Sequence, residues 1–118
     1  MSVAHFMVWF VLAWVAGGAR FMADVGAESE SPQARISRGK NLYLKHCAGC
    51  HGPEGKGDGY RLLGPDPANL TSPSTRKKSD AVLLKTIHEG KPNMPSWKLQ
   101  LSEQDSRDVL SYVRALER

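Results

Sequence analysis

Apolar side chains recur at helical spacing in three segments of the chain beyond residue 30. In the first segment, the spacing of three or four residues predicts a helix with one buried face. Ser31 followed by Pro32 is typical of the N-terminus of such a helix. The positions on the predicted buried face are Ile36, Gly39, Tyr43 and Cys47.

Two further helices are predicted nearer the C-terminus. Ser79 or Asp80 caps a helix over residues 81–89, and Gly90 ends it because glycine readily takes the conformation that follows a helix. Ser102, with an acidic residue three positions later, predicts the start of the last helix in a weaker form of the capping box. The apolar stripe of this last helix consists of Val109, Tyr112, Val113 and Leu116.

The segment between the first two predicted helices has no hydrophobic periodicity. Residues 52–78 hold five Gly and four Pro, and 27 residues without regular structure are unusual in a compact domain. No segment shows the alternation of a half-buried strand. The pattern therefore predicts an all-α fold with three main helices and one long loop that needs something to pack against.

The apolar run over residues 3–19 differs from these helices because it has no polar face. An apolar core followed by small residues and a polar start is typical of an export signal, with Ala19 and Ala27 as candidate cleavage points. No basic residue precedes the run, which is near the minimum length for crossing a bilayer, so a retained membrane anchor is the alternative. We expect residues 1–27 to be signal or anchor and residues 28–118 to form one domain outside the cytoplasm.

Composition shows what the predicted domain lacks. The chain is 41% hydrophobic, but 20 of the first 27 residues are apolar against 28 of the remaining 91. That remainder has no Phe, and Trp97 and Met94 are its only Trp and Met. A small domain buries a low fraction of its surface, and two Cys allow at most one disulfide. The composition therefore excludes a disulfide-rich scaffold and favours a non-peptide group that completes the core.

The sequence Cys47-Ala48-Gly49-Cys50-His51 is the most specific chemical signal in the chain. C-x-x-C-H is the attachment pattern of c-type haem. Two thiols three residues apart on a helical turn can reach the two vinyl groups of one porphyrin, and His51 then supplies a nitrogen ligand to the iron. We therefore predict one covalent haem c, held by Cys47 and Cys50.

Three other interpretations of the two cysteines are weaker. A thioredoxin-like redox pair requires a βαβ unit, which the pattern does not predict. A zinc site built on His46, Cys47, Cys50 and His51 lacks a second ligand pair at ordinary spacing. A structural disulfide between the cysteines explains neither the adjacent histidine nor the missing core.

Met94 is the candidate for the sixth ligand of the iron. It lies between Pro92 and Pro95, which restrict the backbone and suit a side chain that must point at one atom. His88 or His46 is the alternative, and an open sixth position is the third possibility. Ligation by His and Met raises the reduction potential and occupies both faces of the iron, so it favours electron transfer over substrate binding.

These features resemble the monohaem class I cytochromes c of the small bacterial kind. The resemblance covers residues 31–118 and rests on the C-x-x-C-H motif, on the sequence MPSW at residues 94–97 and on the closing helix. It implies a cytochrome c-like fold in which three main helices wrap one covalently bound haem, and the first and last helices cross at Gly39 and Tyr112. The segment over residues 52–78 is longer than in the smallest members of that family.

The resemblance also implies a contact that orients the axial imidazole. In the family a proline carbonyl pairs with this ring, and Pro67 is the candidate here, with Pro65 as the alternative. A haem would also give the long loop a surface to pack on, and the Gly-rich run over residues 52–59 would turn over its edge. Candidates for the pocket walls, with ordinary core packing as the alternative role, are Leu62, Leu63, Leu70, Leu83, Ile87, Trp97 and Leu99.

Charge favours a protein partner over nucleic acid. The net charge is +4, and it is the same without residues 1–27, but no basic-aromatic pattern is present. We expect lysines near the haem rim to steer docking onto an acidic redox partner, with a solubilising surface as the alternative. These lysines are Lys56, Lys77, Lys78, Lys91 and Lys98.

The sequence therefore predicts a one-electron carrier with no catalysis of its own. We expect it in the bacterial periplasm, either soluble after signal cleavage or tethered to the membrane through residues 3–19. One alternative is a haem-bearing electron-transfer subunit of a membrane-associated dehydrogenase or oxidase complex. The other is a ligand-binding haem sensor, which needs an open sixth position.

Overall fold

The computed structural model describes residues 29–61 and 67–116. Within these residues the β-type pairing is limited to an isolated bridge between Lys91 and Met94, so the predicted all-α class is confirmed. The predicted signal or anchor, and the candidates Leu62, Leu63 and Pro65, lie outside the described residues. The helices are α1 (Pro32–His46), α2 (Ala48–His51), α3 (Pro73–Arg76), α4 (Asp80–Glu89) and α5 (Glu103–Leu116).

The helix α1 begins, and the helix α4 begins and ends, where the local sequence predicts. The Ser31 side chain accepts a hydrogen bond from the Ala34 amide at 3.2 Å, and the Ser79 side chain accepts one from the Val82 amide at 3.3 Å. Ser79 is therefore the cap of α4. Gly90 follows this helix with φ of 72°, a left-handed value that glycine tolerates best.

The one-turn helix α3 lies in the segment predicted to be irregular. Ser72 caps it and Pro73 is its first residue, the same Ser-Pro arrangement that starts α1. The described part of residues 52–78 therefore includes a short helix, and the prediction of an unbroken loop there was wrong. A four-residue helix carries too few apolar positions to give a periodic signal, so only the Ser-Pro pair could have indicated it.

The start of α5 is a reciprocal capping arrangement. The Asp105 carboxylate accepts hydrogen bonds from the Ser102 amide at 2.9 Å and the Ser102 hydroxyl at 2.8 Å. The Ser102 hydroxyl in turn accepts one from the Asp105 amide at 3.0 Å. The bond from the Ser102 amide is the main cause that lowers the pKa of Asp105 below its ordinary value.

Asp105→Ala is expected to cost about 0.5–1 kcal/mol of folding free energy at neutral pH, as the loss of an exposed cap generally does. Because the folded-state pKa is lowered, this contribution is present above the ordinary aspartate pKa and is lost as pH falls through the folded value. Urea denaturation at pH 7 and pH 3 measures both. Glu103→Gln, which removes a charge from the same turn without removing the cap, is the control; an equal loss at both pH values would contradict this account.

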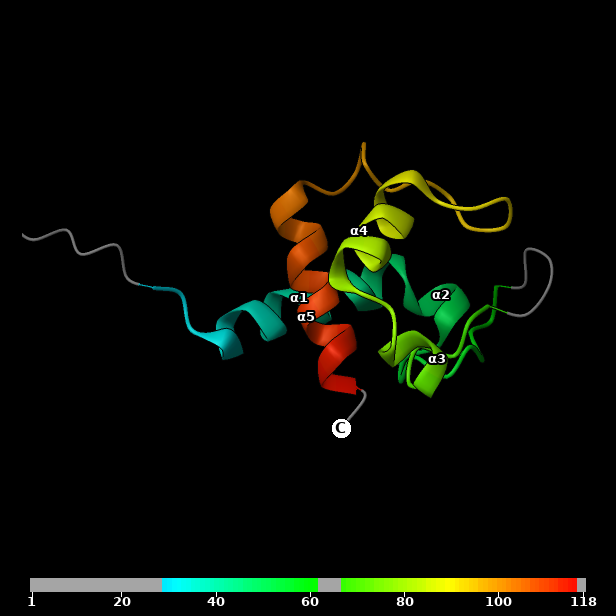
Figure 1. Ribbon diagram of the computed structural model, residues 1–118, viewed down its shortest axis with the longest axis horizontal. Coiled ribbons are helices and arrows are strands. Elements are labelled where there is room, and N and C mark those ends of the chain that lie inside the picture. Colours follow the sequence, from blue (N-terminus) through cyan, green and yellow to red (C-terminus); the bar gives the residue numbers. More distant parts are fainter. Residues whose placement is uncertain (1–28, 62–66, 117–118) are drawn as a thin grey trace, which may run out of the picture.

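The helices α1 and α5 make the most extensive contact between elements and cross near the centre of Figure 1. A Cβ on Gly39 would overlap the Asp108 carbonyl oxygen and lie 2.5 Å from its carbon, so the two backbones touch there. The rings of Tyr43 and Tyr112 meet beside this point, with centroids 5.2 Å apart. The predicted crossing at Gly39 and Tyr112 is thus present.

The buried carboxylate of Asp108 on α5 pairs with Arg38 on α1 and stabilises the same crossing. Asp108 is 1% exposed, and its Oδ2 accepts from Nε and a terminal nitrogen of Arg38, both at 2.9 Å. Its Oδ1 accepts from Gln104 at 2.9 Å. Every carboxylate oxygen therefore has a donor, as burial of a charge requires.

The apolar core behind this crossing is small for a domain. Leu42, Trp97, Tyr112 and other side chains pack against it while remaining partly exposed. Ala48 of α2 and Ile87 of α4 pack against this core, and both also line a cavity beside it. The buried apolar residues are Tyr43, Cys47, Leu101, Val109, Leu110 and Val113.

Candidate cofactor site

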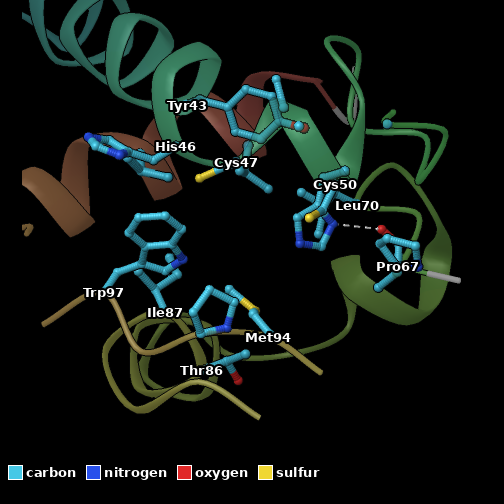
Figure 2. A pocket seen from close by; sticks show the side chains of 18 of the residues that line it. Tyr43, His46, Cys47, Cys50, Pro67, Leu70, Thr86, Ile87, Met94 and Trp97 are labelled. Atoms are coloured by element: carbon cyan, nitrogen blue, oxygen red, sulfur yellow. Dashed lines mark hydrogen bonds between the residues drawn. The ribbon is translucent and has the colours of Figure 1, made fainter. Parts of the chain in front are cut away.

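A cavity of about 810 Å³ lies between the end of α1 and α2 on one side and α4 with the Met94 segment on the other. Figure 2 shows Cys47 and Cys50 on one wall, with Met94, Ile87 and Trp97 facing them across open space. Its volume is within the range of sites that enclose a cofactor. The structure thus brings to one cavity the two predicted attachment residues and both predicted axial ligands, Cys47, Cys50, His51 and Met94.

The two cysteines are held at the break between α1 and α2. Cys47 ends α1, where its amide donates to the Tyr43 carbonyl at 2.8 Å, and Cys50 lies one turn further along. Both are free thiols. Burial, and to a smaller extent the neighbouring Cys50, raise the pKa of Cys47 to about 12, so this thiol is neutral at physiological pH. The described residues form no βαβ unit, so the thiol pair lacks the structural context of thioredoxin-like chemistry.

The His51 ring is oriented by a backbone carbonyl. Its Nδ1 lies 3.0 Å from the carbonyl oxygen of Ala68, drawn as a dashed line in Figure 2. The prediction that the Pro67 carbonyl makes this contact was wrong. The Pro67 oxygen faces Gly57 instead, where an added Cβ would lie 2.6 Å from it, so the next carbonyl along the chain reaches the ring. Pro67 itself lines the cavity.

Met94 reaches the cavity from a short turn that follows α4. Lys91 and Met94 exchange two backbone hydrogen bonds of 2.9 Å, which close the turn over Pro92 and the residue after it. The Trp97 amide donates to the Ile87 carbonyl at 3.1 Å, which ties the turn to α4. These bonds hold the methionine on the wall opposite the cysteines.

The alternative histidine ligands make other contacts. His88 does not line the cavity, and its Nε2 lies 2.7 Å from the hydroxyl of the fully buried Ser106. His46 does line the cavity, but its ring packs on Trp97 with centroids 5.1 Å apart. Within residues 29–61 and 67–116, no three His, Cys, Asp or Glu side chains gather as a metal site, which leaves zinc without a ligand set.

The predicted walls are largely in place. Leu70, Leu83, Ile87 and Trp97 line the cavity, as do Thr86 and Thr75. Leu99 was predicted with them, but it is 89% exposed because it lies in the turn after Trp97 and its side chain points into solvent. Ala68 was not predicted, and its role rests on a backbone oxygen that no side-chain pattern marks.

Several positively charged side chains line the cavity. Of the five predicted lysines, Lys78 and Lys91 line it, together with Lys45 and Arg61, which were not predicted. Among the described lining residues, Asp58 is the single carboxylate. The remaining three lysines lie elsewhere: Lys77 and Lys98 do not line the cavity, and Lys56 pairs with Glu54 at 3.2 Å.

Comparison with known proteins agrees with this geometry. Residues 34–113 match the family model of cytochrome c oxidase, cbb3-type, subunit III, and the chain belongs to this family. It is 33% identical to the Cbb3-type cytochrome c oxidase subunit CcoP of Rhodobacter capsulatus over 71% of this chain, which corresponds to 30% of that relative. Among solved structures it resembles the KustC0563 c-type cytochrome, with 28% identity and a TM-score of 0.58 over 68% of this chain and 98% of the other.

The family and the fold define the class of the protein. It is a small c-type cytochrome with the all-α cytochrome c fold that the sequence resemblance implied. In the described part of the chain, no helix is long and apolar enough to cross a membrane.

Proposed function

We propose that Cys47 and Cys50 hold a single haem c covalently and that His51 and Met94 are its axial ligands. The observation that carries this proposal is the donor set: one apolar cavity presents two thiols and an imidazole from one wall and a thioether from the other. When bound, the haem supplies a one-electron ferrous/ferric couple. The residues present fit this group in number, chemical type and cavity size.

The surrounding residues prepare the site for electron transfer. The Ala68 carbonyl accepts a hydrogen bond from the Nδ1–H group of His51, so the neutral ring keeps its proton on Nδ1 and its Nε2 lone pair is free to ligate. Leu70, Ile87 and Trp97 exclude water from the walls, so little solvent has to reorganise when charge changes. Because Met94 closes the opposite face, the site is suited to carrying electrons and not to binding substrate.

We further propose that this carrier works as a component of a terminal oxidase, in preference to a freely diffusing shuttle. The support is the match of residues 34–113 to a subunit family of cbb3-type oxidases. The chain spans 30% of the length of the curated relative. Its assignment to an oxidase is therefore our proposal and is not carried over from that relative. We also propose export through residues 1–27, and hence a periplasmic site of action, because the apolar run over residues 3–19 is followed by small residues and a polar start.

Mass spectrometry of the protein produced in a haem c-maturing host tests the attachment. We expect the mass of the peptide plus one haem, and a mature N-terminus that reports whether residues 1–27 are removed. Cys47→Ala with Cys50→Ala should abolish covalent haem, whereas Leu99→Ala, which alters an exposed side chain, should leave it intact. A mass of peptide alone, with zinc found by metal analysis, would contradict the proposal.

The cationic residues that line the cavity are proposed to dock an acidic redox partner. Lys78→Glu should slow electron transfer to such a partner by about tenfold at low ionic strength, because it reverses a charge on the cavity lining. Lys77→Glu is the matched control, since it makes the same charge change on a neighbouring exposed residue that does not line the cavity. Equal slowing by the two changes would show that the steering charge is not confined to the cavity lining, whereas stopped-flow rates that are independent of salt and unchanged by both substitutions would argue for a merely solubilising role.

A further inference from the structure

The helix that carries His51 is too short to hold its own shape. α2 has four residues, Ala48–His51, and an isolated turn of this length is unstable because nucleating it costs more than its few hydrogen bonds return. The last four carbonyls of any helix also lack partners within the helix. In α2, the Ala48 carbonyl accepts from the Gly52 amide at 2.9 Å, which leaves the carbonyls of the other three residues to be satisfied from outside.

The segment over residues 57–61 provides those partners. The Gly57 amide donates to the His51 carbonyl at 2.7 Å, and the Gly59 amide donates to the Cys50 carbonyl at 3.1 Å. The Arg61 amide donates to the Gly49 carbonyl at 2.7 Å. Every second amide of the segment therefore meets one carbonyl of the turn that bears the axial ligand.

The glycines of this segment are required by the closeness of the contact. A Cβ on Gly59 would lie 2.5 Å from both the carbon and the oxygen of the Cys50 carbonyl. Gly57 has φ of 81°, and a Cβ there would lie 2.6 Å from the Pro67 oxygen. No flexible side chain could yield at these points, because the atoms met are backbone.

We propose that residues 57–61 form a carbonyl clamp that positions His51 toward the iron. The clamp holds the main chain of His51, while the Ala68 carbonyl holds its ring at Nδ1. The same loop joins the two contacts, because the Leu70 amide donates to the Gly55 carbonyl at 2.6 Å. This inference rests on the proposed function, since it takes His51 to be an axial ligand.

Gly59→Ala in the haem-loaded protein tests the clamp. We expect an upward shift of the reduction potential, because a misaligned imidazole donates less to the iron and stabilises the ferric state less. We also expect altered paramagnetic NMR shifts of the His51 ring protons. Lys56→Ala, at an exposed position of the same loop, is the control and should leave both readouts at wild-type values.

Arg61→Pro and Arg61→Ala provide a second test in case Gly59→Ala does not load haem. Both lack the guanidinium, but only proline lacks the amide that donates to Gly49, so their difference isolates the clamp bond. The proline variant should differ from the alanine variant in potential and in His51 ring shifts. If the wild-type protein carries haem and the two Arg61 variants have equal potentials and ring shifts, the clamp alone is overturned. If the wild-type protein carries no haem, the clamp and the proposed function are overturned together.

Discussion

Replacing Met94 by alanine is expected to lower the reduction potential by on the order of a tenth of a volt or more, since axial ligands set haem potentials over a wide range. Thioether ligation favours the ferrous state, and the change removes it. The second expected effect is rapid binding of carbon monoxide by the reduced protein, because the variant leaves the face of the haem opposite His51 open. A redox titration and the visible spectrum after addition of carbon monoxide measure the two effects.

His88→Asn is the matched variant for this experiment. His88 is the competing candidate for the sixth ligand, but its ring is hydrogen-bonded to Ser106 and does not line the cavity. We therefore expect His88→Asn to leave the reduced protein unreactive toward carbon monoxide. Fast, stoichiometric binding by the wild-type protein would exclude Met94 as a ligand and would favour the sensor alternative.

Gly39→Ala is expected to destabilise the protein by about 3 kcal/mol or more, the upper range for overpacking a close contact. At an exposed helix position the same change stabilises by about 1 kcal/mol, because alanine has the higher helix propensity. The sign reverses here because the new methyl group would overlap the Asp108 backbone, and α1 and α5 would have to separate. Separation would also strain the pair between Arg38 and the buried Asp108 carboxylate.

Urea denaturation of the haem-loaded proteins measures this effect. Lys40→Ala is the control, because Lys40 is the exposed neighbour of Gly39 on the same helix. We expect it to change stability by less than about 0.5 kcal/mol. If Gly39→Ala were as stable as the control, the two helices would not meet backbone to backbone at this point.

Features of the site that depend on local chemistry were predictable from the sequence. The spacing of Cys47, Cys50 and His51 defines an attachment motif within one helical turn, so no long-range information is needed to identify it. Serine caps and the glycine after α4 set helix ends through hydrogen bonds that span three or four residues. The small residue at Gly39 could be assigned to a helix crossing because the resemblance to small cytochromes c supplied the partner helix.

The contacts between distant segments could not be predicted in the same way. The partner of His51 is a main-chain oxygen of Ala68, and backbone groups are the same at every residue, so the proline chosen from the family was off by one position. Leu99 looks like any other wall residue in the sequence, but the direction of its turn exposes it. Lys78 and Lys77 differ only in which of them borders the cavity.

The sequence by itself determined the class of the protein, the three main helices and the residue types that could hold a haem, because these follow from periodicity, caps and one short motif. Only the tertiary structure decided that Met94 faces Cys47 and Cys50 across one cavity and that residues 57–61 support the turn carrying His51. Those arrangements depend on backbone hydrogen bonds and on the direction of turns between residues far apart in the chain. Neither the long-range backbone hydrogen bonds nor the directions of the turns can be recognised from a pattern of residue types in the sequence.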